Sequence, residues 1–115
     1  MEKAEIQALI REAFAAQKFA YVPYSRFHVG AALRGKNGQV FRGCNIENAS
    51  YTPTNCAERT ALFKAVSEGV REFDAIAIVG SKQGEINTIV TGPCGVCRQA
   101  LYEFGGDSLT VIMAK

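Results

Sequence analysis

Apolar residues recur at spacings of three and four along the first part of the chain, which predicts a helix over about Ala4–Phe19 with one apolar stripe. From Phe27 to Leu33 the pattern changes to an alternation of period two, as in a strand. Lys36–Gly38 then supplies turn chemistry before a second run, Val40–Glu47, that we also interpret as a strand. These segments predict a helix followed by a β-hairpin.

The second half of the chain predicts two more helices and two more strands. Helical periodicity returns over Asn55–Ser67 and over Cys97–Phe104. The runs Ala75–Val79 and Leu109–Met113 are short and wholly apolar, a pattern typical of strands that are covered on both faces. The order helix, strand, strand, helix, strand, helix, strand predicts an α/β fold in which a mixed sheet has helices on both faces.

Length and composition narrow the class of protein. The 115 residues, 48% of them hydrophobic, suffice for one domain with its own core and leave little room for a second. The 13 Lys and Arg residues are nearly balanced by 11 Asp and Glu residues, and no basic cluster is present, which argues against nucleic-acid and anionic-membrane partners. We therefore expect a single domain over residues 1–115 that binds neither.

The sequence also bears on the location of the protein in the cell and on the state of its cysteines. The acidic start Met1–Glu5 is unlike a signal peptide, and no run approaches the roughly 20 apolar residues of a membrane span. We therefore expect a soluble, cytoplasmic protein. In a reducing compartment its four cysteines are expected to be free, metal-bound or reactive rather than paired in disulfides.

Three of the cysteines stand where helices are expected to begin, Cys56 before one helix and Cys94 and Cys97 before another. Thiolate sulfur suits Zn²⁺, and the Cys-x-x-Cys spacing lets two sulfurs converge on one ion. Helix N-termini favour anionic sulfur and so ease ligation. Three protein ligands with an open fourth position are typical of a catalytic zinc, and three packed, metal-free thiols are the alternative.

Neighbouring residues add to this hypothesis. Glu58 follows Cys56 by two residues, and side chains of a first helical turn lean toward the N-terminus, so its carboxylate is expected near a zinc-bound water without being a ligand. Arg59 and Arg98 are placed to hydrogen-bond thiolate sulfurs and offset their negative charge. For Glu58 and for both arginines, the alternative is an ordinary solvated charge on the surface. Cys44 lies in a predicted strand and is expected to be a packed structural thiol rather than a fourth ligand.

Three runs carry most of these residues: Cys44–Tyr51, Asn55–Ala61 and Pro93–Gln99. Together with Tyr21–Ser25 and the following strand, they resemble the small homotetrameric cytidine deaminases over about residues 21–104. The joint presence of the three runs is specific, whereas a lone Cys-x-x-Cys would be weak. The resemblance implies a three-layer α/β/α sandwich, hydrolysis of free cytidine and deoxycytidine to uridine, deoxyuridine and ammonia, and a homotetramer with shared active sites.

The resemblance also implies a role for each matching position. Cys56, Cys94 and Cys97 would hold Zn²⁺, and Glu58 would shuttle protons from the attacking water to N3 of the pyrimidine and to the departing ammonia. The implied substrate contacts are the ribose hydroxyls for Asn45 and Glu47, the base for Phe27 and Val29, and the pyrimidine edge for the backbone of Ala57.

Asn45 and Glu47 are two residues apart in the predicted strand and are expected to share one face of it. Solvent-facing positions for this pair, and a core position for Phe27, are the alternatives. His28 alternates with Phe27 and faces the opposite side, so we expect no catalytic role for it. Members of the family usually continue with another strand and a tail that supplies an aromatic residue to the pocket, and we expect no counterpart of that segment before Lys115.

Two rival functions remain open from the sequence. One is a deaminase of the same chemistry that acts on a nucleoside antibiotic. The other is a non-catalytic structural zinc module with Cys44 as the fourth ligand. Deamination of bases within RNA or DNA is disfavoured, because the chain has no basic path for a nucleic-acid strand.

Overall fold

The computed structural model describes residues 2–50, 54–82, 95–105 and 109–114. The elements are helix α1 (Lys3–Gln17), strands β1 (Phe27–Gly35) and β2 (Val40–Cys44), helix α2 (Ala57–Ser67), strand β3 (Phe73–Lys82), helix α3 (Gly95–Gly105) and strand β4 (Thr110–Met113). Their order is the one that the sequence predicts.

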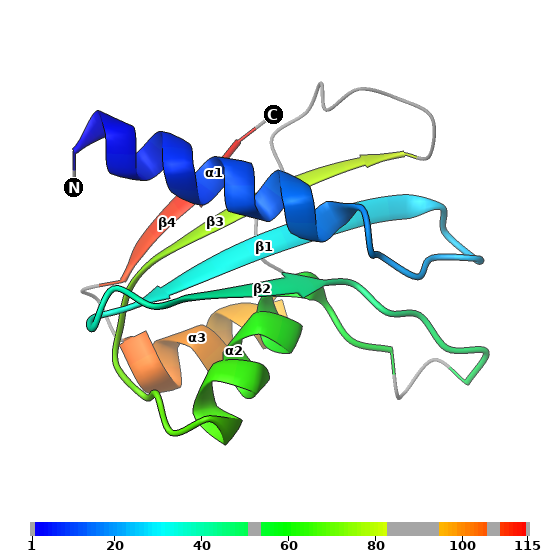
Figure 1. The fold of residues 1–115 in the computed structure, drawn as a ribbon. Coiled ribbons are helices and arrows are strands. Elements are labelled where there is room, and N and C mark those ends of the chain that lie inside the picture. The colour runs from blue at the N-terminus through cyan, green and yellow to red at the C-terminus, as the bar shows by residue number, and fades with distance from the viewer. Residues whose placement is uncertain (1, 51–53, 83–94, 106–108, 115) are drawn as a thin grey trace.

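The strands form one mixed sheet in the order β2-β1-β3-β4. Strand β1 runs antiparallel to both of its neighbours, and β4 runs parallel to β3. A parallel pair needs a crossover connection, and α3 lies in it. Helix α1 lies across one face of the sheet and α2 and α3 cover the other (Figure 1). The predicted α/β/α arrangement is confirmed.

The alternation of side chains along β1 separates two cores. Ala31 and Leu33 belong to the cluster beneath α2 and α3, whereas Ala32 belongs to the cluster beneath α1. The cluster on the α2 face is the larger and contains the bulkier side chains, among them Leu33, Phe41, Leu62, Phe73, Ile76 and Ile78. The central strands are therefore buried on both faces, which explains their largely apolar composition.

Two glycines let helices approach the sheet at backbone distance. A Cβ atom on Gly30 would overlap with the carbonyl oxygen of Ala13 in α1, and one on Gly43 would overlap with the carbonyl oxygen of Ala57 in α2. The obstructing atoms belong to helix backbones, which cannot move aside as the tip of a flexible side chain can. Gly43 thereby helps to set the height of the first turn of α2 above the sheet.

The structure corrects the predicted end of β2. The strand ends at Cys44 instead of continuing to Glu47, because beyond one backbone bond from the Asn45 amide to the Val29 carbonyl the side chain of Asn45 makes the further hydrogen bonds to β1. The expectation that Asn45 and Glu47 belong to this strand is therefore wrong, and their common orientation stays a prediction. Helix α2 likewise begins at Ala57 and not at Asn55.

The other two strands also differ from their predictions. Strand β3 extends beyond the apolar run to Phe73–Lys82, because Ser81 and Lys82 still pair with β1. Strand β4 was expected to be covered on both faces, but Val111 and Met113 are exposed. It is an edge strand, paired with β3 alone in the described part of the sheet. None of the helices in the described residues combines the length and the apolar character needed to cross a lipid bilayer.

Candidate active site

The N-terminus of α2 carries two of the residues for which the sequence predicts chemistry. Cys56 is the N-cap, with extended backbone at φ −76° and ψ 157°, and Glu58 lies in the first turn. Glu58 is only 4% exposed and is the one buried acidic or basic side chain within the described ranges. Burying a carboxylate is costly unless its surroundings compensate, so a buried acid beside a thiol at a helix end indicates a functional site.

Arg59 contacts the thiol of Cys56. Its Nη2 donates a hydrogen bond to Cys56 Sγ at 3.6 Å, a contact that the sequence analysis anticipates. A guanidinium beside sulfur stabilises the thiolate over the thiol, and the positive end of the α2 dipole acts in the same direction. Both effects prepare Cys56 to bind a metal cation.

The remaining predicted ligands belong to α3 and the segment before it. Cys97 lies in the first turn of α3, a helix that packs beside α2 (Figure 1). Cys94 lies outside the described residues, and so do the side chains of Cys97 and Arg98. Within the described residues no three His, Cys, Asp or Glu side chains gather. The three-cysteine site therefore stays a prediction, and the chemistry of its visible part, a helix-end thiol with a cationic neighbour, fits Zn²⁺.

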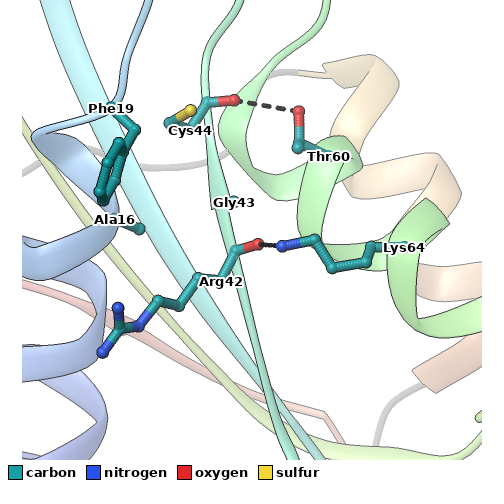
Figure 2. Close-up of a pocket in the computed structure, with 7 residues that line it drawn as sticks. All are labelled: Ala16, Phe19, Arg42, Gly43, Cys44, Thr60 and Lys64. Carbon is teal, nitrogen blue, oxygen red and sulfur yellow. Dashed lines mark hydrogen bonds between the residues drawn. The ribbon is translucent and has the colours of Figure 1, made fainter.

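Cys44 points away from α2. It pairs with Gly30, whose missing side chain would face α1, and directly paired residues share one face of a sheet. Cys44 accordingly lines a pocket of about 300 Å³ next to Phe19 (Figure 2). Burial raises the pKa of its thiol. This environment suits a packed thiol and disfavours the thiolate that a fourth ligand needs.

Asn45 meets two of the residues predicted to bind the base. Its Oδ1 accepts a hydrogen bond from the Val29 amide at 2.9 Å, and its Nδ2 donates to the Phe27 carbonyl at 2.8 Å. Val29 packs against the core beneath α2 and Phe27 is half-buried. One N–H and one lone pair of the Asn45 amide are not used in these bonds, so the side chain can also bind a ligand.

Glu47 is held by a loop that the sequence analysis did not connect with it. Its Oε1 accepts hydrogen bonds from the backbone amides of Tyr24 at 3.0 Å and Ser25 at 3.1 Å. The Ser25 side chain, followed by these backbone amides, holds the pKa of Glu47 below its ordinary value. A carboxylate offers about four acceptor positions, so capacity for a ligand hydroxyl remains.

A pocket of about 330 Å³ opens beside this carboxylate. Its lining residues are Tyr24, Ser25, Glu47, Asn48, Ala49 and Thr54. Pro23 predicts a turn near Ser25, but no sequence signal indicates that the turn binds a carboxylate 22 residues away.

Backbone pairing joins the two halves of the site. Ile46 and Asn55 exchange both of their backbone hydrogen bonds, at 2.9 Å and 2.8 Å. Ile46 lies between Asn45 and Glu47, and Asn55 precedes Cys56. The segment with polar, ligand-capable side chains therefore runs next to the segment that leads into α2. Ala57, whose backbone was expected to meet the base, begins that helix and is fully buried.

Comparison with known proteins agrees with this geometry. The family model described as the cytidine and deoxycytidylate deaminase zinc-binding region matches residues 3–113. The cytidine deaminase of Sporosarcina psychrophila is 50% identical over 109 residues, which is 95% of this chain and 76% of that protein. The cytidine deaminase of Halalkalibacterium halodurans is 60% identical over 97 residues, 84% of this chain and 70% of that protein.

Solved structures show the same architecture. The crystal structure of cytidine deaminase from Burkholderia pseudomallei superimposes with a TM-score of 0.84 at 51% sequence identity, covering 99% of this chain and 85% of the other.

Proposed function

This chain belongs to the cytidine and deoxycytidylate deaminase family, and we propose that it catalyses the hydrolytic deamination of free cytidine and deoxycytidine to uridine, deoxyuridine and ammonia. The observation that carries the proposal is the buried Glu58 carboxylate two residues beyond Cys56, at the end of α2 that attracts anions. The relatives that carry the name cytidine deaminase support the same reaction.

In this proposal Cys56, Cys94 and Cys97 hold Zn²⁺, with Arg59 and Arg98 balancing the charge of their thiolates. A zinc ion in such a three-ligand site supplies a water molecule that is activated for attack near neutral pH. The orientation of Cys44 toward α1 supports an open fourth position, because that thiol lies on the other face of the sheet.

Glu58 then acts as the proton shuttle. Its carboxylate accepts a proton from the attacking water and delivers it to N3 of the pyrimidine while the oxygen bonds to C4. The remaining hydroxyl proton passes to the amino group on C4, the C4–N bond breaks, and ammonia leaves as the carbonyl forms. Burial of Glu58 supports this role, because a carboxylate screened from bulk water exchanges protons with its bound partner rather than with solvent.

The sugar and the base are assigned to the neighbouring segment. Asn45 and Glu47 bind ribose hydroxyls with the hydrogen-bonding capacity that their protein contacts leave over. Phe27 and Val29 border the base from the face of the sheet that α2 covers, and the backbone of Ala57 meets the pyrimidine edge. These assignments combine apolar side chains for the base with a few polar groups for the sugar, as small-molecule sites generally do.

We also propose that the protein is a homotetramer with shared active sites. Exposed apolar side chains on the outer surfaces of α2 and α3, Phe63 and Tyr102, support burial against another copy. Analytical ultracentrifugation of the purified protein tests this assembly, and a monomer at micromolar concentration contradicts it.

The experiment that tests the reaction measures the ultraviolet absorbance of cytidine with purified protein of known zinc content. Turnover that depends on one zinc per chain supports the proposal. Faster turnover of a cytosine nucleoside antibiotic than of cytidine identifies the first rival. Stoichiometric zinc without turnover, lost on Cys44→Ser, identifies the structural zinc module.

A further inference from the structure

The hydroxyl of Thr60, one turn into α2, touches three separate parts of the candidate site. Its Oγ1 lies 3.0 Å from the carbonyl oxygen of Cys56, 3.0 Å from the carbonyl oxygen of Cys44 and 3.1 Å from Nδ2 of Asn55. Figure 2 shows it directed from α2 to the carbonyl group of Cys44. One side chain thus contacts the helix N-cap, the end of β2 and the segment between them.

The chemistry of a hydroxyl makes this contact set informative. A hydroxyl has one hydrogen to donate and lone pairs that accept, so the hydrogen is shared between the two carbonyl groups while Asn55 donates to the oxygen. A threonine in a helix often bonds the carbonyl group four residues earlier, which here is that of Cys56. The bonds to Cys44 and Asn55 are not part of this common intrahelical pattern, because they join the helix to other segments.

The joined segments carry different functions in the proposed reaction. Cys56 is a proposed metal ligand, whereas Cys44 immediately precedes Asn45, a proposed sugar-binding residue. Cys44 and Cys56 are far apart in the sequence, so noncovalent bonds are needed to fix the distance between them. The Ile46 and Asn55 backbone pair supplies two of these bonds, and the Thr60 hydroxyl links the end of β2 to the helix one turn nearer to the N-cap than the bond from Lys64 Nζ to the Arg42 carbonyl group.

We propose that Thr60 is a positioning residue, which sets the register between the metal and proton-shuttle end of α2 and the sugar-binding segment 45–47. The inference rests on the proposed function. Thr60 acts through its neighbours and not by contact with the substrate. Supporting contacts behind metal ligands are typically worth about ten- to a hundred-fold in activity or metal affinity, and a misplacement of about 1 Å can cost about a hundred-fold.

The test compares Thr60→Val, which keeps the shape but removes the hydroxyl, with Thr60→Ser, which restores it. Ser67→Ala is the matched control, because Ser67 Oγ donates to the Lys64 carbonyl at 2.7 Å at the other end of the same helix. Each full chain is loaded with zinc, and kcat/KM is measured for cytidine and for 2′,3′-dideoxycytidine, which lacks the 2′- and 3′-hydroxyls of the sugar. Cobalt-loaded samples add an absorption spectrum that reports the metal geometry without turnover.

We expect Thr60→Val to lower kcat/KM for cytidine by about ten- to a hundred-fold, to lower it less for the dideoxy substrate, and to shift the cobalt bands. Thr60→Ser should restore the ratio of the two substrates, and Ser67→Ala should leave the ratio and spectrum unchanged. An unchanged ratio and spectrum in Thr60→Val would overturn the inference, and so would an equal change in Ser67→Ala.

If Thr60→Val does not fold, Asn55→Ala removes the donor to the Thr60 hydroxyl while the hydroxyl itself stays, and should reduce the substrate ratio in the same direction. A ratio equal to that of the unsubstituted protein in Asn55→Ala then overturns the inference. Failure of the proposed function is distinguishable, because in that case the unsubstituted zinc-loaded chain itself does not deaminate cytidine.

Discussion

Helices approach the two faces of the sheet equally closely, but the polar groups beneath them differ between the faces. On one face α1 rests over Gly30, and on the other α2 rests over Gly43, with helix backbone where a Cβ atom would stand. On the α1 face several polar groups pair with one another, whereas the buried Nε2 of His28 has no hydrogen-bond partner among the described residues. Gln17 donates to Ser81 and to the His28 carbonyl group, and Arg34 bridges acids of α1 and β3.

On the α2 face several polar groups keep binding capacity. Glu58 is a buried carboxylate, Cys56 has a guanidinium at its sulfur, and Asn45 and Glu47 use only part of their hydrogen-bonding groups within the protein. The same close approach thus stabilises the molecule on one face and positions reactive groups on the other. A buried carboxylate beside a helix-end thiol, rather than polarity alone, distinguishes the functional face.

The largest contrast is expected between two cysteines on opposite faces. Cys97→Ala should release zinc, lower the melting temperature and reduce cytidine turnover below detection, because a proposed ligand that ties α3 to α2 is lost. Cys44→Ser should keep its zinc, because this thiol faces α1. Metal analysis and thermal unfolding check both variants. Full zinc content in Cys97→Ala would show that another residue is the ligand.

The next largest effect is expected from the acids. Glu58→Gln should keep zinc and fold but lose about 10²- to 10⁴-fold in kcat, since the amide cannot carry the proton. Glu12→Gln makes the same chemical change on α1, where the carboxylate pairs with exposed Arg42, and should leave kcat unchanged. Steady-state kinetics with cytidine compares the two. An active Glu58→Gln enzyme contradicts the assigned role and with it the contrast between the faces.

The glycines provide the most direct comparison of the two faces. Gly30→Ala and Gly43→Ala each insert a methyl group against helix backbone and should each cost about 1–3 kcal/mol in the free energy of unfolding. Only Gly43→Ala should also lower kcat at temperatures where both variants are folded, because it displaces the first turn of α2. Urea denaturation and kinetics separate the two effects. Equal loss of kcat in both would mean that the faces are not functionally distinct.

The smallest effect is expected from the ion pair on the α1 face. The Arg34 guanidinium holds the pKa of Asp74 below its ordinary value, so the folded protein binds this proton less readily than the unfolded chain does. The stabilisation is therefore complete above the ordinary pKa of aspartate and is lost as the pH falls through the lowered one. Because the pair is partly exposed, Asp74→Asn should cost only about 0.2–1 kcal/mol at neutral pH.

The pH profile of that variant completes the prediction. Its stability should converge with that of the unsubstituted protein in acid, as judged by urea unfolding at several pH values, and its kcat at neutral pH should not change. A difference in stability that persists or grows in acid would contradict the stated cause of the pKa shift.

Much of the fold could be predicted because it depends on local patterns. The apolar spacing in α1 and the alternation in β1 follow from which side must be buried, and both elements form close to their predicted limits. The predicted end of β2 was wrong because, after one last backbone bond from the Asn45 amide to Val29, the Asn45 side chain rather than the backbone continues the contact with β1. A pattern of apolar residues does not indicate where a side chain replaces the backbone in pairing with a neighbouring strand.

For the candidate site, the sequence by itself determined the residue types and their spacing: the thiol at the start of α2, the acid two positions later and the arginine after it. Only the tertiary structure decided that Glu58 is buried, that Cys44 faces α1, and that Ser25 and Thr60 hold the polar segment in place. The physical reason is that helix-end chemistry is local in sequence, whereas burial and hydrogen-bond partnership depend on which distant segments the sheet brings together.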